Sequence, residues 1–138
     1  MKVRVKWIED VAFLGETESG HGLVIDGAPA AGGRNLGARP LEMLLLGVGG
    51  CSAFDVVLIL KKMREPIEDV IADVTAERAD NDPKVFTKLH LHFKVKGKGL
   101  SENKVKQAIQ LSAEKYCSAS IMLGKAVDIT HDFKVIET

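Results

Sequence analysis

The sequence has few aromatic residues, few cysteines and no excess charge of either sign. Aromatic residues make up 5% of its 138 positions, which argues against a surface that stacks nucleic-acid bases. The 19 lysines and arginines are balanced by 19 aspartates and glutamates, so no net field attracts nucleic acid or anionic lipid. The 2 cysteines are too few for a secreted disulfide framework or a sulfur-rich zinc site. We therefore expect a soluble globular protein of a reducing compartment.

No segment resembles a secretion signal or a convincing membrane span. The first residues alternate basic and apolar side chains as a strand does: Lys2, Val3, Arg4, Val5, Lys6 and Trp7. The long apolar segment over residues 41–60 includes Glu42 and Asp55. An acid inside a spanning helix costs roughly 3 kcal/mol on insertion scales, so a buried helix of a soluble protein fits better. These features predict a cytoplasmic protein without a membrane or nucleic-acid partner.

The order of hydrophobic patterns predicts three strands, a long helix, two strands, two helices and a last strand. Pro40 suits the first position of the long helix, and Pro66 ends it. Clean alternation over residues 85–96 predicts a strand with one buried face. The result is an α+β fold with a mostly antiparallel sheet. We treat residues 1–138 as one domain, with N-terminal strands and a loop (1–39), a central helix (40–65) and a sheet with two helices (66–138).

The predicted long helix is apolar around its whole circumference, so it must be covered on all sides. The three N-terminal strands and one small sheet can cover only part of it. A second copy of the same helix completes the cover, which predicts a homodimer with these helices at its centre. Gly47, Gly49 and Gly50 would let the backbones approach closely. Alternatively, these glycines relieve crowding against the chain's own sheet.

The two cysteines lie in different settings. Cys51 falls in the middle of the long helix, and Cys117 falls at the break between the two later helices. A free cysteine in an apolar helix usually packs as a small hydrophobic residue. Spacing alone therefore favours a structural role for both thiols.

The two cysteine contexts taken together resemble the OsmC/Ohr family, the osmotically inducible and organic hydroperoxide resistance proteins. The resemblance covers nearly the whole chain, and the residues of the two motifs resemble the short, YhfA-like branch most closely. The residues that carry it are Pro40-Leu41-Glu42, Gly49-Gly50-Cys51-Ser52-Ala53, Asp55-Val56-Val57 and Leu111-Ser112-Ala113-Glu114-Lys115-Tyr116-Cys117. The resemblance implies an intertwined OsmC-like homodimer, with antiparallel sheets packed around a long buried central helix. It also implies a peroxidase that reduces organic hydroperoxides, with a lipoyl-type dithiol as external reductant.

Within this resemblance, Cys51 would be the peroxidatic thiolate and Cys117 the resolving thiol that closes a disulfide. A thiolate in apolar surroundings needs a cation nearby, because burial alone raises its pKa. Arg34 or Arg39, from the loop before the long helix, could supply that cation and orient the peroxide. The order along the chain favours Arg34.

Two acids depart from the family pattern. Active peroxidases of the family carry a glutamate ten residues before the first cysteine, where this chain has Leu41, and Glu42 lies nine residues before Cys51. Nine helical residues turn about 180°, so Glu42 would face away from Cys51 and would instead complement the helix dipole. Asp55 lies one turn after Cys51 and would disfavour a thiolate there unless a cation neutralises it. Asp55 could pair with an arginine or satisfy a dimer contact.

The alternative function is a non-catalytic dimer that binds an apolar small molecule beside an unreactive Cys51. No phosphate loop, nucleophile elbow or dinucleotide fingerprint is present, so no cofactor is expected. His90 and His92 share a strand face and form a possible metal pair. The lysines on the same face favour solvent exposure instead of a metal site, and His131 is expected in the core or at its rim.

Overall fold

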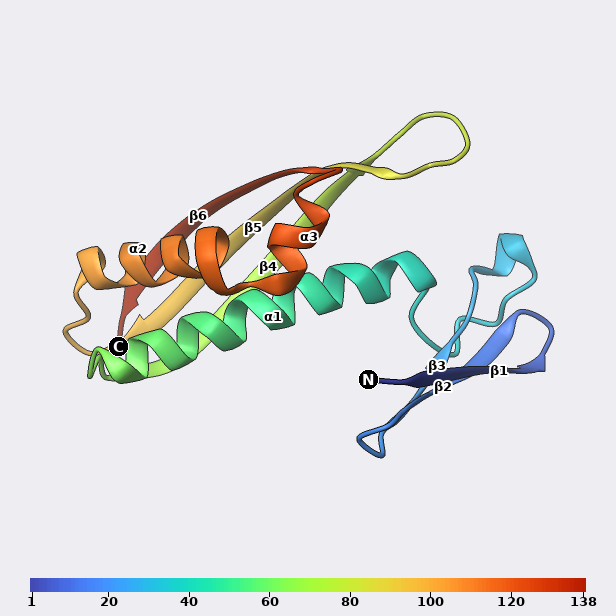
Figure 1. Ribbon diagram of the computed structural model, residues 1–138, viewed down its shortest axis with the longest axis horizontal. Helices are drawn as coiled ribbons and strands as arrows, with labels where there is room; N and C mark the ends of the chain where they lie inside the picture. The colour runs from blue at the N-terminus through green and yellow to red at the C-terminus, as the bar shows by residue number, and fades with distance from the viewer. The chain divides into compact units, whose positions relative to one another are not determined.

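The computed structural model describes all 138 residues, which form two compact units, Met1–Leu45 and Leu46–Thr138. The first unit contains an antiparallel meander of β1 (Val3–Glu9), β2 (Ala12–Thr17) and β3 (Gly22–Ile25), shown in blue in Figure 1. The three predicted strands are thus confirmed. β1 is exposed along its whole length, so its apolar residues have no cover from this unit.

The loop after β3 is organised around Asp26, whose side chain is buried. Its carboxylate accepts hydrogen bonds from the backbone N–H groups of Gly27 (2.7 Å), Leu36 (3.1 Å) and Arg34 (3.2 Å). The amides of Leu36 and Gly27 hold the pKa of Asp26 below its usual value, against the opposing effect of burial. A short helical turn, η1 (Pro29–Ala31), lies within the same loop. Asp26 therefore fixes the path of the segment that carries Arg34.

Helix α1 (Pro40–Lys62) begins at Pro40, as predicted. The Glu42 carboxylate accepts a hydrogen bond from the Arg39 backbone N–H at 2.9 Å, which is half of a capping box. α1 has the length and composition of a membrane span, and only 28% of its most apolar stretch is buried within the chain. Several apolar side chains of α1 are thus exposed in the single chain, among them Leu44, Leu46, Phe54 and Leu58.

The second unit contains the sheet β4 (Ile67–Arg78), β5 (Phe86–Gly97) and β6 (Asp128–Glu137), in the order β4-β5-β6. β4 and β5 form an antiparallel hairpin, whereas β5 and β6 are parallel, with Phe93 opposite Phe133. The sheet is therefore less uniformly antiparallel than the sequence indicated. The parallel pairing arises because the chain crosses back through two helices before it enters β6.

Those connecting helices are α2 (Glu102–Leu111) and α3 (Ser118–Leu123), with the π-helical turn η2 (Ser112–Tyr116) between them. Ser101 caps α2, because its hydroxyl accepts a hydrogen bond from the Lys104 N–H at 3.3 Å. The predicted helix from Glu102 to about Tyr116 is present, but it is α-helical only as far as Leu111. Its last turn widens into η2 immediately before Cys117.

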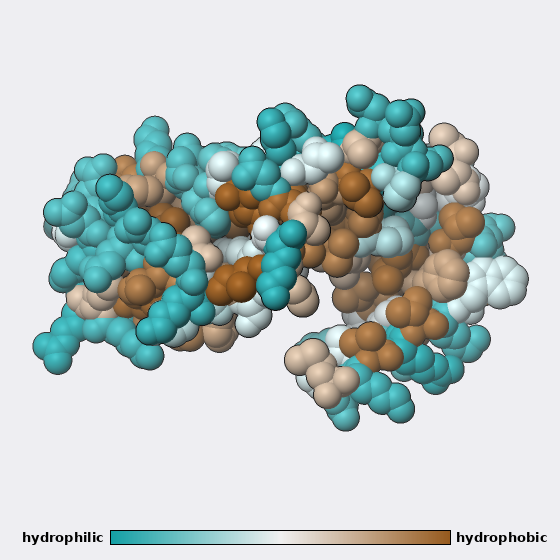
Figure 2. Space-filling model, turned by 45° about the horizontal axis from the view of Figure 1, so that its top comes forward, coloured by the Kyte–Doolittle hydropathy of each residue, from teal (hydrophilic) through white to brown (hydrophobic).

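The core of the second unit lies between one face of the sheet and helices α1 and α2. The buried apolar side chains are Leu89, Leu91, Phe93 and Val95 from β5, Val48, Val56 and Leu60 from α1, and Val105, Ala108 and Ile109 from α2. Gly49 allows the close approach of α1 to the sheet, since a β-carbon there would lie 3.0 Å from Val74 Cγ2. The side of α1 away from this core exposes apolar residues, among them Phe54 (65% exposed). Hydrophobic side chains accordingly reach the surface in Figure 2, where they are brown.

Candidate functional site

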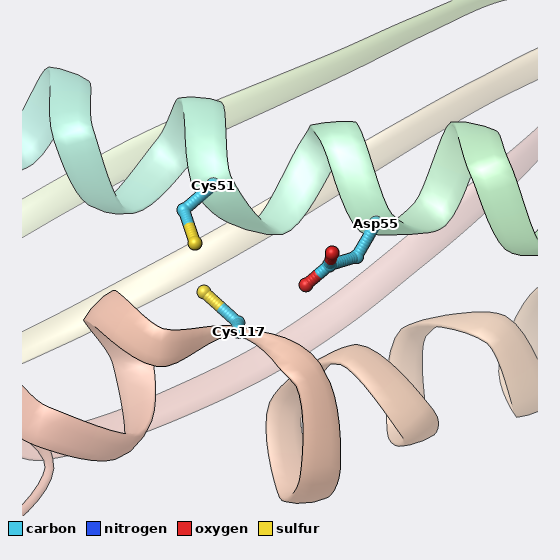
Figure 3. Close-up of side chains that lie close together, drawn as sticks. All are labelled: Cys51, Asp55 and Cys117. Carbon is cyan, nitrogen blue, oxygen red and sulfur yellow. The ribbon is translucent and has the colours of Figure 1, made fainter.

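Cys51 of α1 and Cys117, which follows η2, lie side by side in the second unit although they are far apart in the chain. Figure 3 shows the two sulfur atoms pointing toward one another, with the Asp55 carboxylate beside them. The two sulfur atoms and a carboxylate oxygen all lie within 4.8 Å of one another. Both thiols are free; Cys117 is buried, whereas Cys51 and Asp55 are half-buried. Formation of a disulfide requires the two sulfur atoms to approach from within 4.8 Å to about 2.05 Å.

The turn η2 sets the direction of the Cys117 side chain. The Cys117 N–H donates to the Ser112 carbonyl at 2.8 Å, five residues back, so one extra residue is accommodated in the last turn. Cys117 then leaves the helical conformation (φ −75°, ψ 97°) and precedes α3. Single π turns inside helices often occur at functional sites. Here the turn ends one helix and directs the thiol toward α1.

Three buried serines surround the thiol pair and its acid: Ser52, Ser112 and Ser120. The Ser52 hydroxyl donates to Cys117 Sγ at 3.2 Å and lies 3.2 Å from the Ser120 hydroxyl. The Ser120 backbone N–H also points at Cys117 Sγ, at 3.4 Å. The Ser112 hydroxyl lies 3.3 Å from Asp55 Oδ2 and 3.4 Å from the Ser52 carbonyl oxygen.

Sequence reasoning missed these serines. The available signal was their placement next to the cysteines: Ser52 follows Cys51 directly, and Ser120 follows Cys117 by three residues.

The two thiols differ in how readily they ionise. Burial raises the pKa of Cys51, and the nearby Cys117 and Asp55 raise it further, against a hydrogen bond from the Ala119 backbone. Burial also raises the pKa of Cys117, but the hydrogen bonds from Ser120 and Ser52 outweigh it, so the pKa of Cys117 falls below its ordinary value. Within the second unit, Cys117 is therefore the better thiolate.

The other candidate residues, Arg34, Arg39 and Glu42, belong to the first unit. The Arg34 guanidinium pairs with Glu9 and lies 3.7 Å from Asp10, so acidic groups already surround it. These acids raise the pKa of Arg34, with the hydrogen bond to Glu9 as the main cause.

Arg39 and Glu42 lie together at the start of α1. The Arg39 guanidinium donates to Asn35 Oδ1 at 2.5 Å, and its Nε lies 3.9 Å from the Glu42 carboxylate. Each of the two is partly exposed. The first unit therefore contains one arginine–glutamate pair formed from the candidate residues, and that pair is Arg39 with Glu42.

An apolar cavity of about 350 Å³ lies beside Asp55 in the second unit. Four of its lining residues, Asp55, Leu58, Ile59 and Lys62, are three, four and seven positions apart and therefore share one face of α1. The cavity runs along this face in the direction away from Cys51. The cavity is lined by Asp55, Leu58, Ile59, Lys62, Met63, Leu111 and Tyr116. It has the composition expected of a site for an apolar ligand.

The histidines form a polar cluster on the opposite face of the sheet. Asp132 Oδ1 lies 2.8 Å from His90 Nε2 and 2.7 Å from His92 Nδ1, and Thr130 lies 2.6 Å from His90 Nδ1. These histidine side chains are partly exposed, in agreement with a solvated face. His131 is half-buried and stacks on Phe93 at 6.4 Å between ring centroids, and burial lowers the pKa of His131.

Comparison with known proteins agrees with this geometry. The family model described as OsmC-like protein matches residues 32–132. The chain belongs to the OsmC-like family. It is 46% identical to Protein YhfA of Escherichia coli strain K12 over 136 residues, which are 99% of this chain and 98% of that one. The predicted family and the α+β OsmC-like fold are thereby confirmed.

Solved structures share the OsmC-like fold over nearly the full length of the chain. A hypothetical protein of Aquifex aeolicus VF5 is 27% identical with a TM-score of 0.87, covering 99% of this chain and 96% of its own. The organic hydroperoxide resistance protein OhrB of Bacillus subtilis is 19% identical with a TM-score of 0.64, covering 96% of both chains. The second similarity is one of fold alone.

The Ser52 hydroxyl is expected to help keep Cys117 ionisable. Replacing Ser52 by alanine removes a hydrogen bond to the thiolate, so the pKa of Cys117 should rise and its thiolate fraction at a fixed pH should fall. The measurement is the pH dependence of Cys117 alkylation in a Cys51→Ala background, in buffer that contains a chelator.

Ser112→Ala is the matched control, because this buried serine does not contact Cys117 Sγ. An alkylation curve for Ser52→Ala that coincides with that of the control would contradict the assigned hydrogen bond.

Proposed function

We propose that this OsmC-like protein is a thiol-dependent peroxidase that reduces organic hydroperoxides through Cys51 and Cys117. The observation that carries the proposal is the facing pair of free thiols, with sulfur atoms within 4.8 Å, joined to a serine network. A packed, purely structural cysteine pair would need no hydrogen-bond donors aimed at one sulfur. Solved structures that share the fold include proteins whose names state organic hydroperoxide resistance.

The reaction runs in three steps. The Cys51 thiolate attacks the distal peroxide oxygen and the O–O bond breaks, so Cys51 becomes a sulfenic acid and the leaving alkoxide takes up a proton to give the alcohol. The Cys117 thiolate then attacks the Cys51 sulfur, which forms the disulfide and releases water after proton uptake. An external dithiol, of the lipoyl type by family resemblance, reduces the disulfide and is itself oxidised. The lowered pKa of Cys117 supports its resolving role, because that attack requires a thiolate.

The first step needs a cation that the immediate surroundings of Cys51 do not supply. Burial raises the pKa of Cys51, and the Asp55 charge acts in the same direction. We propose that Arg39 supplies the cation and that Glu42 orients it. Arg39 and Glu42 form an arginine–glutamate pair, although Glu42 lies one residue after the position of the family's glutamate. The Arg34 guanidinium is engaged by Glu9 and Asp10. Chain order favours Arg34, which stays the second candidate in this proposal.

The apolar cavity beside Asp55 supports an organic rather than an inorganic peroxide. Its lining from Leu58, Ile59 and Met63 suits a hydrocarbon chain, and it begins one turn from Cys51 along α1. Hydrogen peroxide is strongly hydrated in water. An apolar cavity offers few hydrogen-bond partners to replace that hydration, so hydrogen peroxide binds there less favourably than an organic hydroperoxide. The substrate class proposed is thus an alkyl or aryl hydroperoxide.

We further propose that the active form is a cytoplasmic homodimer, with copies of α1 packed together. The side of α1 away from the core exposes Leu46 and Phe54, and a β-carbon added at Gly47 or Gly50 would meet no atom within 4 Å. Burying such an apolar face stabilises a dimer by about 25 cal/mol per Å² removed from water. The two glycines leave room for a second backbone, whereas Gly49 serves the contact with the chain's own sheet.

The second candidate function is a non-catalytic dimer that binds an apolar small molecule in the same cavity. The raised pKa of Cys51 beside Asp55 favours this alternative, because a protonated thiol reacts poorly with peroxides. The two functions make opposite predictions for peroxide consumption.

The cysteine roles predict different outcomes for two serine substitutions. Cys51→Ser should abolish the reduction of an alkyl hydroperoxide, whereas Cys117→Ser should still reduce one equivalent and accumulate a sulfenic acid at Cys51. Peroxide loss and trapping with a dimedone-type reagent measure these outcomes. Ser118→Ala, an exposed neighbour of Cys117, should behave as the wild type. Wild-type protein that consumes no hydroperoxide with any dithiol would favour the binding function.

The two candidate arginines can be separated by glutamine substitutions. Arg39→Gln should slow sulfenic acid formation by at least tenfold, in line with the usual size of one lost charge-stabilising group. Arg34→Gln should slow it less. Stopped-flow oxidation of Cys51 in the Cys117→Ser background gives both rates. A larger effect of Arg34→Gln than of Arg39→Gln would assign the cation to Arg34. Unchanged rates in both variants would exclude both arginines from the activation of Cys51.

The dimer depends on the exposed apolar face of α1. Phe54→Glu should convert the dimer to a monomer, because it places a charge in the proposed interface at a position that is 65% exposed in the single chain. Light scattering coupled to size-exclusion chromatography measures the mass. Val85→Glu makes the same change at an exposed apolar residue of the β4–β5 hairpin and should leave the mass unchanged. A wild-type mass of one chain would refute the dimer.

A further inference from the structure

Asp55 has no part in the peroxidase reaction proposed above. Its carboxylate faces the two sulfur atoms, and its charge raises the pKa of the thiol that has to ionise first. It accepts a hydrogen bond from Ser112 at 3.3 Å but forms no ion pair with any lysine, arginine or histidine within its own unit. A half-buried carboxylate next to two thiols therefore lacks a compensating positive charge.

We propose that Cys51, Cys117 and Asp55 form a binding site for Zn²⁺. The two sulfur atoms and the carboxylate oxygen lie within 4.8 Å of one another, and all three side chains converge on the same space in Figure 3. In a tetrahedral zinc site, Zn–S bonds of about 2.3 Å place two sulfur ligands about 3.8 Å apart. The three ligand atoms reach that spacing by movements of roughly 1 Å or less, within the range of side-chain rotation.

The donor set selects the class of metal. Two thiolates and one carboxylate match Zn²⁺ and other thiophilic divalent ions, whereas Mg²⁺ and Ca²⁺ prefer an all-oxygen shell. Two thiolates and a carboxylate carry three negative charges, and the divalent ion cancels two of them, so the loaded site keeps one negative charge. Half-buried Cys51 leaves room for water as the fourth ligand. Each thiol releases its proton to the buffer on binding, and no electron is transferred.

The buried serines provide the outer shell that such a site requires. Ser52 and the Ser120 N–H direct hydrogen bonds at Cys117 Sγ, and Ser112 holds the Asp55 carboxylate. Hydrogen bonds of this kind orient first-shell ligands and tune their basicity. The serine contacts thus position two of the three proposed ligands, Cys117 and Asp55.

Zinc and peroxide would compete for the same thiols. With Zn²⁺ bound, both sulfur lone pairs are engaged, so sulfenic acid formation slows. The Cys51–Cys117 disulfide in turn offers no thiolates and releases the ion. This consequence rests on the proposed peroxidase function, whereas zinc binding itself does not.

Metal titration of the reduced full-length protein tests the site directly. Co²⁺ added without oxygen should give one equivalent of binding per chain, with sulfur-to-cobalt charge-transfer absorbance and the intense visible bands of tetrahedral coordination. Zn²⁺ should displace the Co²⁺. Competition with a chromophoric chelator then gives the zinc affinity, and peroxide reduction is measured separately in chelator-treated buffer.

Asp55→Asn is the decisive variant, because it keeps the shape of the side chain and removes its charge. It should weaken Zn²⁺ binding by at least tenfold, while Glu114→Gln, an acid on η2 outside the ligand set, should bind as the wild type does. Absence of the charge-transfer bands, or equal affinity of Asp55→Asn and the wild type, would overturn the proposal.

X-ray absorption of the zinc-loaded wild type keeps the test independent of whether any variant folds. Two sulfur and two oxygen scatterers per zinc are expected, and four sulfur scatterers or none would overturn the site. Inactivity toward hydroperoxides together with intact zinc binding would refute only the peroxidase function.

Discussion

Helix α1 lies against its sheet at a distance that Gly49 permits, since a β-carbon at that position would lie 3.0 Å from Val74. This contact determines which side of α1 faces the core, and it places Ser52, Val56 and Leu60 inside. Cys51 and Asp55 then lie at the edge of that face, where η2 brings Cys117 to them. The same packing leaves Phe54 on the far side, uncovered. One close helix–sheet approach therefore organises both the thiol pair and the apolar surface proposed as the dimer interface.

The serine network makes the two thiols differ in pKa, a difference that composition alone cannot indicate. Hydrogen bonds from Ser120 and Ser52 offset the burial of Cys117, so its pKa is lowered, whereas burial and neighbouring charge raise the pKa of Cys51. In a chain with no net charge, the activation of Cys51 has to come from a local cation. In the proposed reaction, Cys117 is the resolving thiol with a lowered pKa, and Cys51 is the peroxidatic thiol that requires a nearby cation. The same arrangement of thiols and Asp55 suits a zinc ion when no peroxide is present.

Much of the fold could be predicted because its signals are local. Pro40 marks the start of α1, alternation marks β5, and Ser101 marks the start of α2. The parallel pairing of β6 was not predicted, because strand direction depends on how the crossover through α2 and α3 closes. The family and the proximity of Cys51 and Cys117 followed from the short motifs around the two cysteines. The choice between Arg34 and Arg39 did not, because Glu42 lies one residue away from the position of the family's glutamate.

The surroundings of the thiols could not be predicted in the same way. The Ser112 hydroxyl contacts Asp55, which comes from a distant segment, and the Ser120 N–H contacts Cys117 Sγ. The π turn that directs Cys117 depends on one extra residue in a helix whose composition is ordinary. Asp26, which holds the loop before α1 by three backbone hydrogen bonds, likewise appears in sequence as one acid among many.

The central claim is that Cys51 and Cys117 act as one redox pair. Its most direct test is mass spectrometry of fully reduced wild-type protein after one equivalent of an alkyl hydroperoxide. The predicted result is a loss of two hydrogen atoms per chain, one equivalent of alcohol, and a proteolytic peptide in which Cys51 is joined to Cys117. An unchanged mass with the peroxide intact, or oxidation of Cys51 to a sulfinic acid with Cys117 still a free thiol, would contradict the account.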